Sequence, residues 1–328
     1  MGKTKGMKLR WNNGIEVSNG SRIIMDPRRT LSGVTALITH AHSDHVPRDV
    51  RNPKSEMIAT TITGKALESV FQAPKESLVL SDFGKEIEID QFRVTPLIAG
   101  HVPGSAMFLL EKGRYRILYT GDVNPRGGLA VEGPAEVPEA DVLIIESTYG
   151  NPKFRFPDQD LVRAKIVEWT LSVVSEGSIP IFSVYPLGKA QEIIALLNKA
   201  TRLKVLVTEE VERMSSVCKP FFELSYERLQ EIEDFRSAVV KGPCSNVLID
   251  GSKLAIATGW ALILRPKRVH RAFPLSSHAD FNGLLEIVRR SKARQVYTVF
   301  GFSNDLTSYL RMKLNVKAAP LGKDWTFL

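Results

Sequence analysis

An apolar run that ends in a cluster of metal-ligand side chains constrains this chain more than any other part of its sequence. Residues 34–39 predict a strand, and the sequence His-Ala-His-Ser-Asp-His follows at once as residues 40–45. Imidazole and carboxylate groups suit zinc and other divalent ions. In extended backbone, residues two apart point the same way, so His40 and His42 can converge on one ion. Asp44 and His45, past a turn, can address a second ion beside it.

Three further candidate residues follow other predicted strands. The strands predicted at 92–98, 116–120 and 142–145 lead to His101, Asp122 and Glu146 respectively. Active-site groups on loops at strand ends, held by a rigid sheet, are a common architecture. The carboxylate of Asp122 has two oxygens and can therefore bridge two ions. Two ions about 3.5–4 Å apart can polarise a phosphoryl or carbonyl group and generate hydroxide near neutral pH.

A fifth histidine, His278, provides a candidate acid. Glu146 could orient this imidazole and favour its protonated form, and such a group near a scissile phosphate can protonate the leaving oxygen. Ser276 and Ser277 are either turn residues or hydroxyls that reach a phosphate. Gly188-Lys189 at the start of a predicted helix is a weak anion-binding signal, because most such glycines are turn residues, but Lys189 at the positive end of the helix dipole is a candidate phosphate contact.

Length and composition leave the class of partner open. The 328 residues allow two units or one elaborated unit, and 43% apolar content can supply a sizeable core. The net charge of +8 favours polyanionic partners but is weak evidence alone, and the basic run 265–271 is either a solvated face or a polyanion-facing one. No apolar run reaches the roughly 18 residues of a spanning helix. We therefore expect a cytoplasmic protein with no membrane partner.

The middle of the chain predicts a second α/β unit. Helices at 163–174 and 191–199 alternate with strands at 178–184 and 205–208, which is the order of a small parallel sheet. The charged stretch 222–237 predicts an exposed helix, and residues 254–260 predict another strand.

The motifs resemble those of the metallo-β-lactamase superfamily in order and approximate spacing. Residues 40–45, Gly100-His101 and Thr120-Gly121-Asp122 match its successive metal motifs. Residues 144–150, 186–192 and 275–280 resemble the later motifs of the β-CASP branch, the nucleic-acid nucleases of that superfamily. The sequence Phe-Arg-Phe-Pro-Asp at 154–158 is similar to DNA-ligase-associated exonucleases and to archaeal proteins labelled as mRNA 3′-end processing factors. The resemblance covers about residues 8–325.

This resemblance implies a fold and a set of ligands. The implied fold is an α/β (αββα) sandwich core at 1–150 and 274–328, interrupted by a short β-CASP α/β cap at 151–273. The catalytic residues it implies are Glu146 and His278 as an acid pair, with Asp44 at the ions. The metal ligands it implies are His40, His42, His101 and Asp122 for one zinc, and Asp44, His45 and Asp122 for the other.

One position departs from the family pattern. RNA-acting members usually carry a further histidine in the segment that matches Thr298–Gly301, where this chain has Phe300. Phenylalanine cannot ligate a metal, so we expect one tightly bound zinc and a weaker second site that Mn²⁺ or Mg²⁺ could load. DNA-acting relatives also lack that histidine, which favours DNA.

The sequence therefore predicts a metal-dependent nuclease that acts on single-stranded DNA or RNA. We expect a 5′→3′ exonuclease, with DNA favoured over RNA, in DNA repair or RNA processing and in association with DNA ligase, repair or RNA-processing machinery. One alternative is a small-molecule thioester, ester or lactone hydrolase of the same superfamily. Another is a weakly active nucleic-acid-binding subunit of an RNA-processing complex. The β-CASP motifs and the basic balance argue against the first alternative. The retention of residues 40–45, His101, Asp122, Glu146 and His278 argues against the second.

Overall fold

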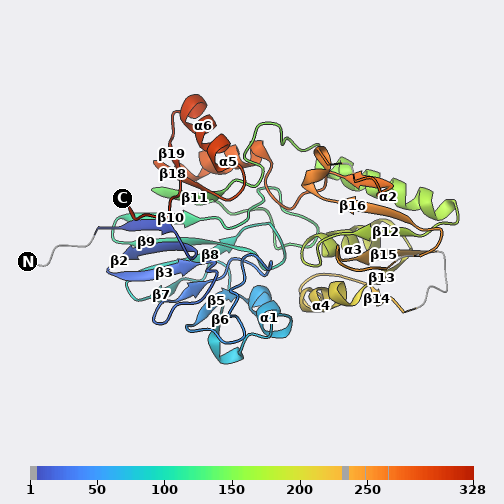
Figure 1. Ribbon diagram of the computed structural model, residues 1–328, viewed down its shortest axis with the longest axis horizontal. Helices are drawn as coiled ribbons and strands as arrows, with labels where there is room; N and C mark the ends of the chain where they lie inside the picture. Colours follow the sequence, from blue (N-terminus) through green and yellow to red (C-terminus); the bar gives the residue numbers. More distant parts are fainter. Residues whose placement is uncertain (1–5, 231–235, 248, 265) are drawn as a thin grey trace, which may run out of the picture. The chain divides into compact units, whose positions relative to one another are not determined.

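The chain folds into two units, and in sequence the second is inserted into the first. The computed structural model describes residues 6–230, 236–247, 249–264 and 266–328. The first unit comprises Met1–Gly127, Glu132–Lys153 and Ala279–Leu328, and the second comprises Gly128–Val131 and Phe154–His278. Figure 1 colours both units along the chain. In the part of the chain that the structure describes, no helix is long and apolar enough to cross a membrane.

Two seven-stranded sheets form the first unit. The strands of one sheet, in spatial order, are β20 (Thr326–Phe327), β1 (Lys8–Trp11), β2 (Ile15–Asn19), β3 (Ser21–Met25), β4 (Ala36–Leu37), β5 (Met57–Thr60) and β6 (Leu78–Ser81). The strands of the other are β19 (Lys317–Pro320), β18 (Gln295–Val299), β11 (Val142–Glu146), β10 (Tyr115–Tyr119), β9 (Ala106–Lys112), β8 (Phe92–Ile98) and β7 (Ile87–Ile89).

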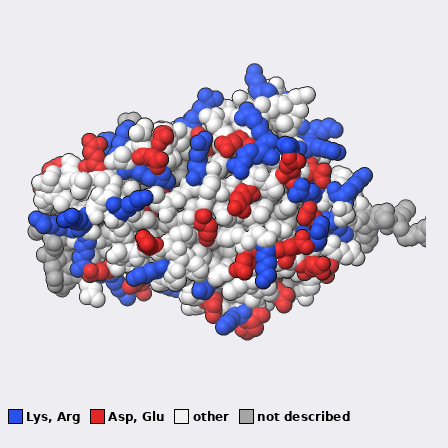
Figure 2. Space-filling view, turned by 180° about the vertical axis from the view of Figure 1, so that it is seen from behind, with Lys and Arg blue, Asp and Glu red and all other residues white. Residues whose placement is uncertain are grey.

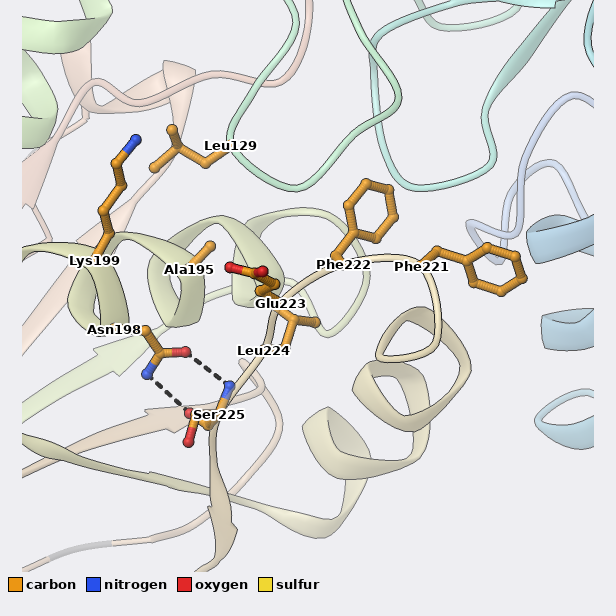
Figure 3. A pocket seen from close by; sticks show the side chains of 9 residues that line it. All are labelled: Leu129, Ala195, Asn198, Lys199, Phe221, Phe222, Glu223, Leu224 and Ser225. Atoms are coloured by element: carbon orange, nitrogen blue, oxygen red, sulfur yellow. Dashed lines mark hydrogen bonds between the residues drawn. The ribbon is translucent and has the colours of Figure 1, made fainter.

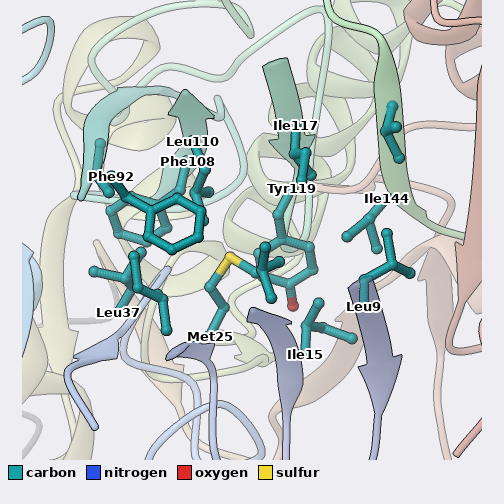
Figure 4. Packing of buried hydrophobic residues seen from close by; sticks show 14 of the residues in the cluster. Leu9, Ile15, Met25, Leu37, Phe92, Phe108, Leu110, Ile117, Tyr119 and Ile144 are labelled. Atoms are coloured by element: carbon teal, nitrogen blue, oxygen red, sulfur yellow. The ribbon is translucent and has the colours of Figure 1, made fainter. Parts of the chain in front are cut away.

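A hydrophobic core fills the space between these two sheets. Leu9 and Met25 from the first sheet pack in one cluster with Phe108, Tyr119 and Ile144 from the second, and all five are buried. Figure 4 shows these side chains meeting between the strands. Alternating burial along β8 follows from the period of two in a strand whose one face is covered, whereas β11 is buried throughout because it is covered on both faces.

Helices cover the outer faces of both sheets, which completes an αββα sandwich (Figure 1). Helix α1 (Thr61–Ser69) brings Leu67 into a cluster with Met57 and Ala36 of the first sheet; the short helix η1 (Lys75–Ser77) follows α1. Helices α5 (Phe281–Ser291) and α6 (Ser303–Leu314) pack on the second sheet. This layering confirms the fold predicted from the sequence.

A single parallel sheet organises the second unit. Its strands, in spatial order, are β14 (Glu227–Arg228), β13 (Lys204–Val207), β15 (Ser237–Lys241), β12 (Pro180–Ser183), β16 (Lys253–Ala257) and β17 (Arg271–Phe273). Every pairing between these strands is parallel. The helices of this unit are α2 (Gln159–Ser175), α3 (Lys189–Ala200), α4 (Glu209–Cys218) and η2 (Gly259–Leu262).

Two local predictions were wrong. The strand expected at 34–39 is only the two residues of β4. The helix expected at 222–237 does not form over its described part, and residues 231–235 lie outside the described residues. There β14 pairs with β13 instead, and Arg228 forms ion pairs with Glu209 at 2.9 Å and Glu212 at 3.6 Å. The charged side chains of this stretch, whose pattern predicted an exposed helix, thus belong to a paired strand and its ion pairs.

Candidate metal centre

The predicted ligands converge at the ends of strands from both sheets. Strands β8 and β10 both run antiparallel to β9, so they point the same way and deliver His101 and Asp122 to one edge of their sheet. The backbone N–H of Ala106, at the start of β9, donates to the carbonyl of Thr39 at 2.8 Å. That bond ties the residue before His40, at the end of the other sheet, to the same edge.

Four side chains offer ligand atoms at the spacing of a metal site. The His42 Nδ1 atom lies 3.1 Å from His40 Nε2 and 3.2 Å from His101 Nε2. The Asp122 Oδ2 atom lies 3.5 Å from each of those two Nε2 atoms. In a tetrahedral zinc site with bonds of about 2.0–2.1 Å, ligand atoms lie about 3.3–3.4 Å apart. This histidine–aspartate cluster (His40, His42, His101 and Asp122) therefore has the composition and the spacing to hold one divalent ion.

Glycines in left-handed backbone place two of these ligands. Gly100 has a φ of +69°, and a Cβ there would lie 2.5 Å from the carbonyl oxygen of Asn124. Gly121 has a φ of +51°, and a Cβ there would lie 2.8 Å from the side chain of Thr39. Any larger residue would be strained and would clash at both positions. The Gly-His and Gly-Asp pairs of the sequence are thus steric requirements of the site.

Asp26 is a site residue that the sequence analysis missed. Its Oδ1 accepts the backbone N–H of Thr39 at 2.8 Å, and its Oδ2 accepts the Thr39 hydroxyl at 2.8 Å. The same Oδ2 accepts from the Tyr119 hydroxyl at 2.9 Å and from His45 Nδ1 at 2.9 Å. This buried carboxylate, with a positive φ of 45°, thus holds the metal-ligand loop, 13 to 19 residues away in sequence, and joins it to Tyr119 of β10, 93 residues away.

These bonds decide which ring nitrogens face the site. The single hydroxyl hydrogen of Thr39 goes to Asp26, because a carboxylate can only accept. Thr39 Oγ1 must then accept the hydrogen of His40 Nδ1, 3.0 Å away, which leaves the lone pair of His40 on Nε2. His45 likewise donates from Nδ1 to Asp26, so its Nε2 points toward Asp122. Partners of this kind typically fix the tautomer of a ligating imidazole.

The residues expected at a second ion are arranged more loosely. The His45 Nε2 atom lies 3.6 Å from Asp122 Oδ2 and 3.9 Å from Asp44 Oδ2, and the Asp44 side chain is 80% exposed. Burial lowers the pKa of His45, but the carboxylates of Asp122, Asp26 and Asp44 together raise it to about 10. The surroundings of His45 therefore favour positive charge.

Phe300 stands beside these second-ion residues. It follows β18, and its ring centroid lies 5.6 Å from that of His45 and 5.2 Å from that of Trp11. Its backbone φ is +61°, which is unusual for a residue with a bulky side chain. An apolar ring therefore occupies space next to His45.

Glu146 ends β11 as a fully buried carboxylate. Its Oε1 accepts the backbone N–H of Val123, the residue after Asp122, at 2.8 Å. The N–H of Ala279 in turn donates to the carbonyl of Val123 at 2.7 Å. The peptide that follows His278 is thus fixed against the loop that carries Asp122.

The candidate phosphate contacts have local roles as well. The Ser276 hydroxyl accepts from the His278 N–H at 3.0 Å and donates to the His278 carbonyl at 3.2 Å, so it shapes this turn. Ser277 is half-buried. Lys189 is the first residue of α3 and is buried. Burial lowers its pKa to about 8, with Glu192 opposing and Arg163 adding to that effect.

Comparison with known proteins identifies the family. The model of a family described as a β-lactamase superfamily domain matches residues 17–180, half of the chain. The chain belongs to the metallo-β-lactamase superfamily. A solved structure of a protein of unknown function from Enterococcus faecalis has a TM-score of 0.71 and 12% identity, and the match covers 98% of this chain and 100% of that one. At this identity the likeness concerns the fold alone.

Two curated relatives are consistent with the β-CASP branch of the superfamily. A protein named "Probable DNA ligase" from Opitutus terrae is 30% identical over 309 residues, which cover 88% of this chain and 29% of that protein. An "RNase J-like protein" from Methanocaldococcus jannaschii is 29% identical over 183 residues, which cover 51% of this chain and 44% of that protein. The chain thus matches less than half the length of either relative.

Proposed function

We propose that this chain is a metal-dependent nuclease that hydrolyses phosphodiester bonds in single-stranded nucleic acid. The observation that carries the proposal is the histidine–aspartate cluster, whose ligand atoms lie 3.1 to 3.5 Å apart at the ends of strands from two sheets. In this proposal the metallo-β-lactamase core is formed by 1–150 and 274–328, and 151–273 form the β-CASP cap.

The chain's own residues supply positioning and proton transfer. A divalent ion, which we propose is zinc, would act as a Lewis acid on the phosphate and activate water near neutral pH when bound by the cluster. Asp26 and Thr39 hold His45 and His40 in the tautomers that present Nε2 to the site. Glu146, buried and held by the Val123 N–H, orients His278, which protonates the leaving oxygen.

Nucleic acid is the substrate class that the relatives favour. The names of both curated relatives refer to nucleic-acid enzymes, a DNA ligase and an RNase, and the sequence carries the β-CASP motifs. Phe300 beside His45 supports one tightly bound zinc, a weaker second site open to Mn²⁺ or Mg²⁺, and a preference for DNA. We propose 5′→3′ exonuclease action in the cytoplasm, in DNA repair or RNA processing, beside DNA ligase, repair or RNA-processing machinery.

A cleavage assay tests this function directly. End-labelled single- and double-stranded DNA and RNA are incubated with the metal-free protein reloaded with Zn²⁺, Mn²⁺ or Mg²⁺. A 5′→3′ exonuclease releases mononucleotides from the 5′ end and leaves a ladder of 3′-labelled fragments, and single-stranded DNA should be degraded fastest.

A parallel assay with a thioester and a lactone tests the alternative. Hydrolysis of either compound without cleavage of any oligonucleotide would overturn the nuclease proposal in favour of a small-molecule hydrolase. Metal-dependent binding of oligonucleotides with no hydrolysis of any substrate would overturn it in favour of a nucleic-acid-binding subunit.

A further inference from the structure

Three cavities in the described part of the second unit differ in their charge. One of about 750 Å³ is lined by Lys199, Phe222 and Glu223, and Figure 3 shows the carboxylate of Glu223 facing its interior. A second, of about 490 Å³, is lined by both acidic and basic side chains, from Glu209, Glu210, Arg213 and Arg228. The third, of about 420 Å³, carries charged or titratable side chains only from Lys165, His270 and Arg271. Among the described residues, no carboxylate lines this third cavity, which we call the cationic cavity.

The hydrogen bonding of His270 fixes which ring nitrogen can donate. The backbone N–H of Leu254 donates to His270 Nδ1 at 2.9 Å, and the N–H of His270 donates to the Leu254 carbonyl at 2.8 Å. Since Nδ1 accepts, the ring hydrogen lies on Nε2. The two bonds hold the imidazole to β16 as a rigid N–H donor of the cavity lining.

The other two polar side chains of the cavity are cations that only donate. Lys165 lies on the exposed face of α2, and Arg271 begins the edge strand β17. The Arg271 guanidinium lies 5.9 Å from the ring centroid of Phe273, and neither cation forms an ion pair within the described residues. Ammonium, guanidinium and an Nε2–H group together match a ligand with several anionic acceptor oxygens, such as a phosphate.

The backbone of this cavity is connected to the turn that carries His278. Gln159 donates from Nε2 to the carbonyls of Pro157 at 2.9 Å and Pro274 at 3.3 Å, and both prolines line the cavity. Its Oε1 accepts the N–H of Ser276 at 3.0 Å. Pro274 and His278 are four residues apart, so their Cα atoms lie within about 14 Å. Pro274, which lines the cavity, therefore lies within about four nucleotides of His278 along a strand at a stacked spacing of about 3.4 Å.

We propose that the cationic cavity binds phosphate groups of the nucleic-acid strand; this inference rests on the proposed nuclease function. Its volume falls in the usual range for small-ligand sites, about 300–1,000 Å³. Net charge does not make this assignment, because basic and acidic side chains are interspersed over the face in Figure 2. The assignment rests instead on the absence of carboxylates from the described lining of the cavity and on the presence of three hydrogen-bond donors there.

Binding by fluorescence anisotropy, with the full chain in EDTA to prevent cleavage, tests the proposal. The probe is a 3′-fluorescein-labelled twelve-nucleotide (dT) oligonucleotide, with either a 5′-phosphate or a 5′-hydroxyl. The test variant is Lys165→Gln/Arg271→Gln, and the control is Lys199→Gln/Arg202→Gln, which removes the same charge from exposed positions of the same unit. Each phosphate contact contributes about 0.7 to the salt slope for single strands, or about fivefold in affinity at 0.1 M salt.

The test variant should therefore lose about 0.7 to 1.4 of the slope and about five- to 25-fold in affinity, and the control variant should lose little. Equal losses with both oligonucleotides assign the cavity to internal backbone phosphates, and a loss confined to the 5′-phosphate form assigns it to the terminal phosphate. Equal affinity of test and control variants would overturn the inference. If the double variant fails to fold by circular dichroism, Arg271→Gln alone is compared with Arg202→Gln.

Cleavage by the wild-type chain separates this inference from the function it rests on. If the wild type cleaves and the cavity substitutions leave binding affinity unchanged, the cavity proposal is rejected and the nuclease proposal is kept. If the cavity substitutions weaken binding but the wild type does not cleave with any of the three metal ions, the cavity proposal is kept and the nuclease proposal is rejected.

Discussion

Replacement of Asp26 by asparagine should weaken both the fold and the metal centre. The carboxylate accepts one bond on Oδ1 from Thr39 N–H and three on Oδ2, from Thr39, Tyr119 and His45. Asparagine tolerates the positive φ of 45° at this position, so Asp26→Asn changes the acceptor without adding backbone strain. The amide nitrogen, however, can only donate.

The magnitude follows from this geometry. In its better orientation the amide keeps its oxygen on the three side-chain donors and turns its NH₂ group against the Thr39 N–H. A buried donor without a partner costs about 1–3 kcal/mol, and the other bonds lose a charged acceptor, so we expect a total loss of roughly 3–5 kcal/mol. The Thr39 hydroxyl, which accepts from His40 Nδ1, also loses its charged acceptor, and His45 loses the carboxylate that holds its ring. Zinc binding should therefore weaken about 10–100-fold.

The variant should also change how stability depends on pH. In the metal-free protein the folded pKa of His45 is raised to about 10 from 6.5. The stability from its proton is therefore fully present below about pH 6.5 and is lost as the pH rises toward 10. Because Asp26 is one of the carboxylates that raise this pKa, the loss should be smaller in Asp26→Asn.

Urea unfolding of the metal-free protein and competitive zinc titration measure both effects. Asp49→Asn is the matched control, because Asp49 accepts the N–H and hydroxyl of Thr30 at 3.0 and 2.8 Å, as Asp26 does with Thr39, but contacts no histidine in the described structure. The control should lose some stability and keep its zinc affinity. If Asp26→Asn unfolds and binds zinc like the wild type, Asp26 does not organise the site.

Three further changes test other parts of the account. His278→Ala should keep the fold and at least one metal and lose about 10²–10⁴-fold in cleavage rate, with Glu146→Gln losing less; wild-type rates in single-turnover cleavage would remove the acid pair. Phe300→His should raise occupancy of the second site in metal titrations, since histidine tolerates a positive φ; unchanged occupancy would mean that the ring only packs against His45. Lys189→Met should stabilise the protein on the order of 2–3 kcal/mol at pH 7, because burial lowers the pKa of this amine from 10.5 to about 8. In the wild type, the loss of folding free energy caused by the buried ammonium should be relieved as the pH rises from about 8 to 10.5. Urea unfolding of Lys189→Met should show no such pH dependence, and a destabilised variant would contradict the buried position of Lys189.

Local pattern predicted the candidate ligands that the structure brings together, but not the carboxylate that holds the loop carrying two of them. Strand β8 begins and ends as predicted because Phe92 and Val94 alternate with exposed residues. The family match covers the segments that carry the predicted metal motifs, whose roles stay a prediction. Asp26, in contrast, looks like an ordinary turn residue before a proline. Its partners include Tyr119, 93 residues away, so only the packing of the two sheets reveals its role.

Charge pattern misled the prediction where pairing between distant segments decides the structure. The charged stretch at 222–237 contains β14, which is stabilised by its parallel pairing with β13 and by the ion pair of Glu227 with Lys204 at 2.7 Å. The burial of Lys189 beside Glu192 at the start of α3 was likewise not predicted, and its role as a phosphate contact stays a prediction. Burial of a charged side chain at a helix start depends on the packing of neighbouring helices, which the periodicity of the sequence does not predict.

Titration of zinc into the metal-free wild type and His42→Ala, with cleavage of labelled single-stranded DNA followed in the same samples, tests the central claim most directly. His42 Nδ1 lies within 3.2 Å of both His40 and His101, so its loss should open the cluster. The wild type should bind the first equivalent tightly and gain cleavage activity on metal addition, whereas His42→Ala should bind zinc weakly and cleave little. Full zinc binding and undiminished cleavage by His42→Ala would contradict the assignment of this cluster as the metal centre of a nuclease.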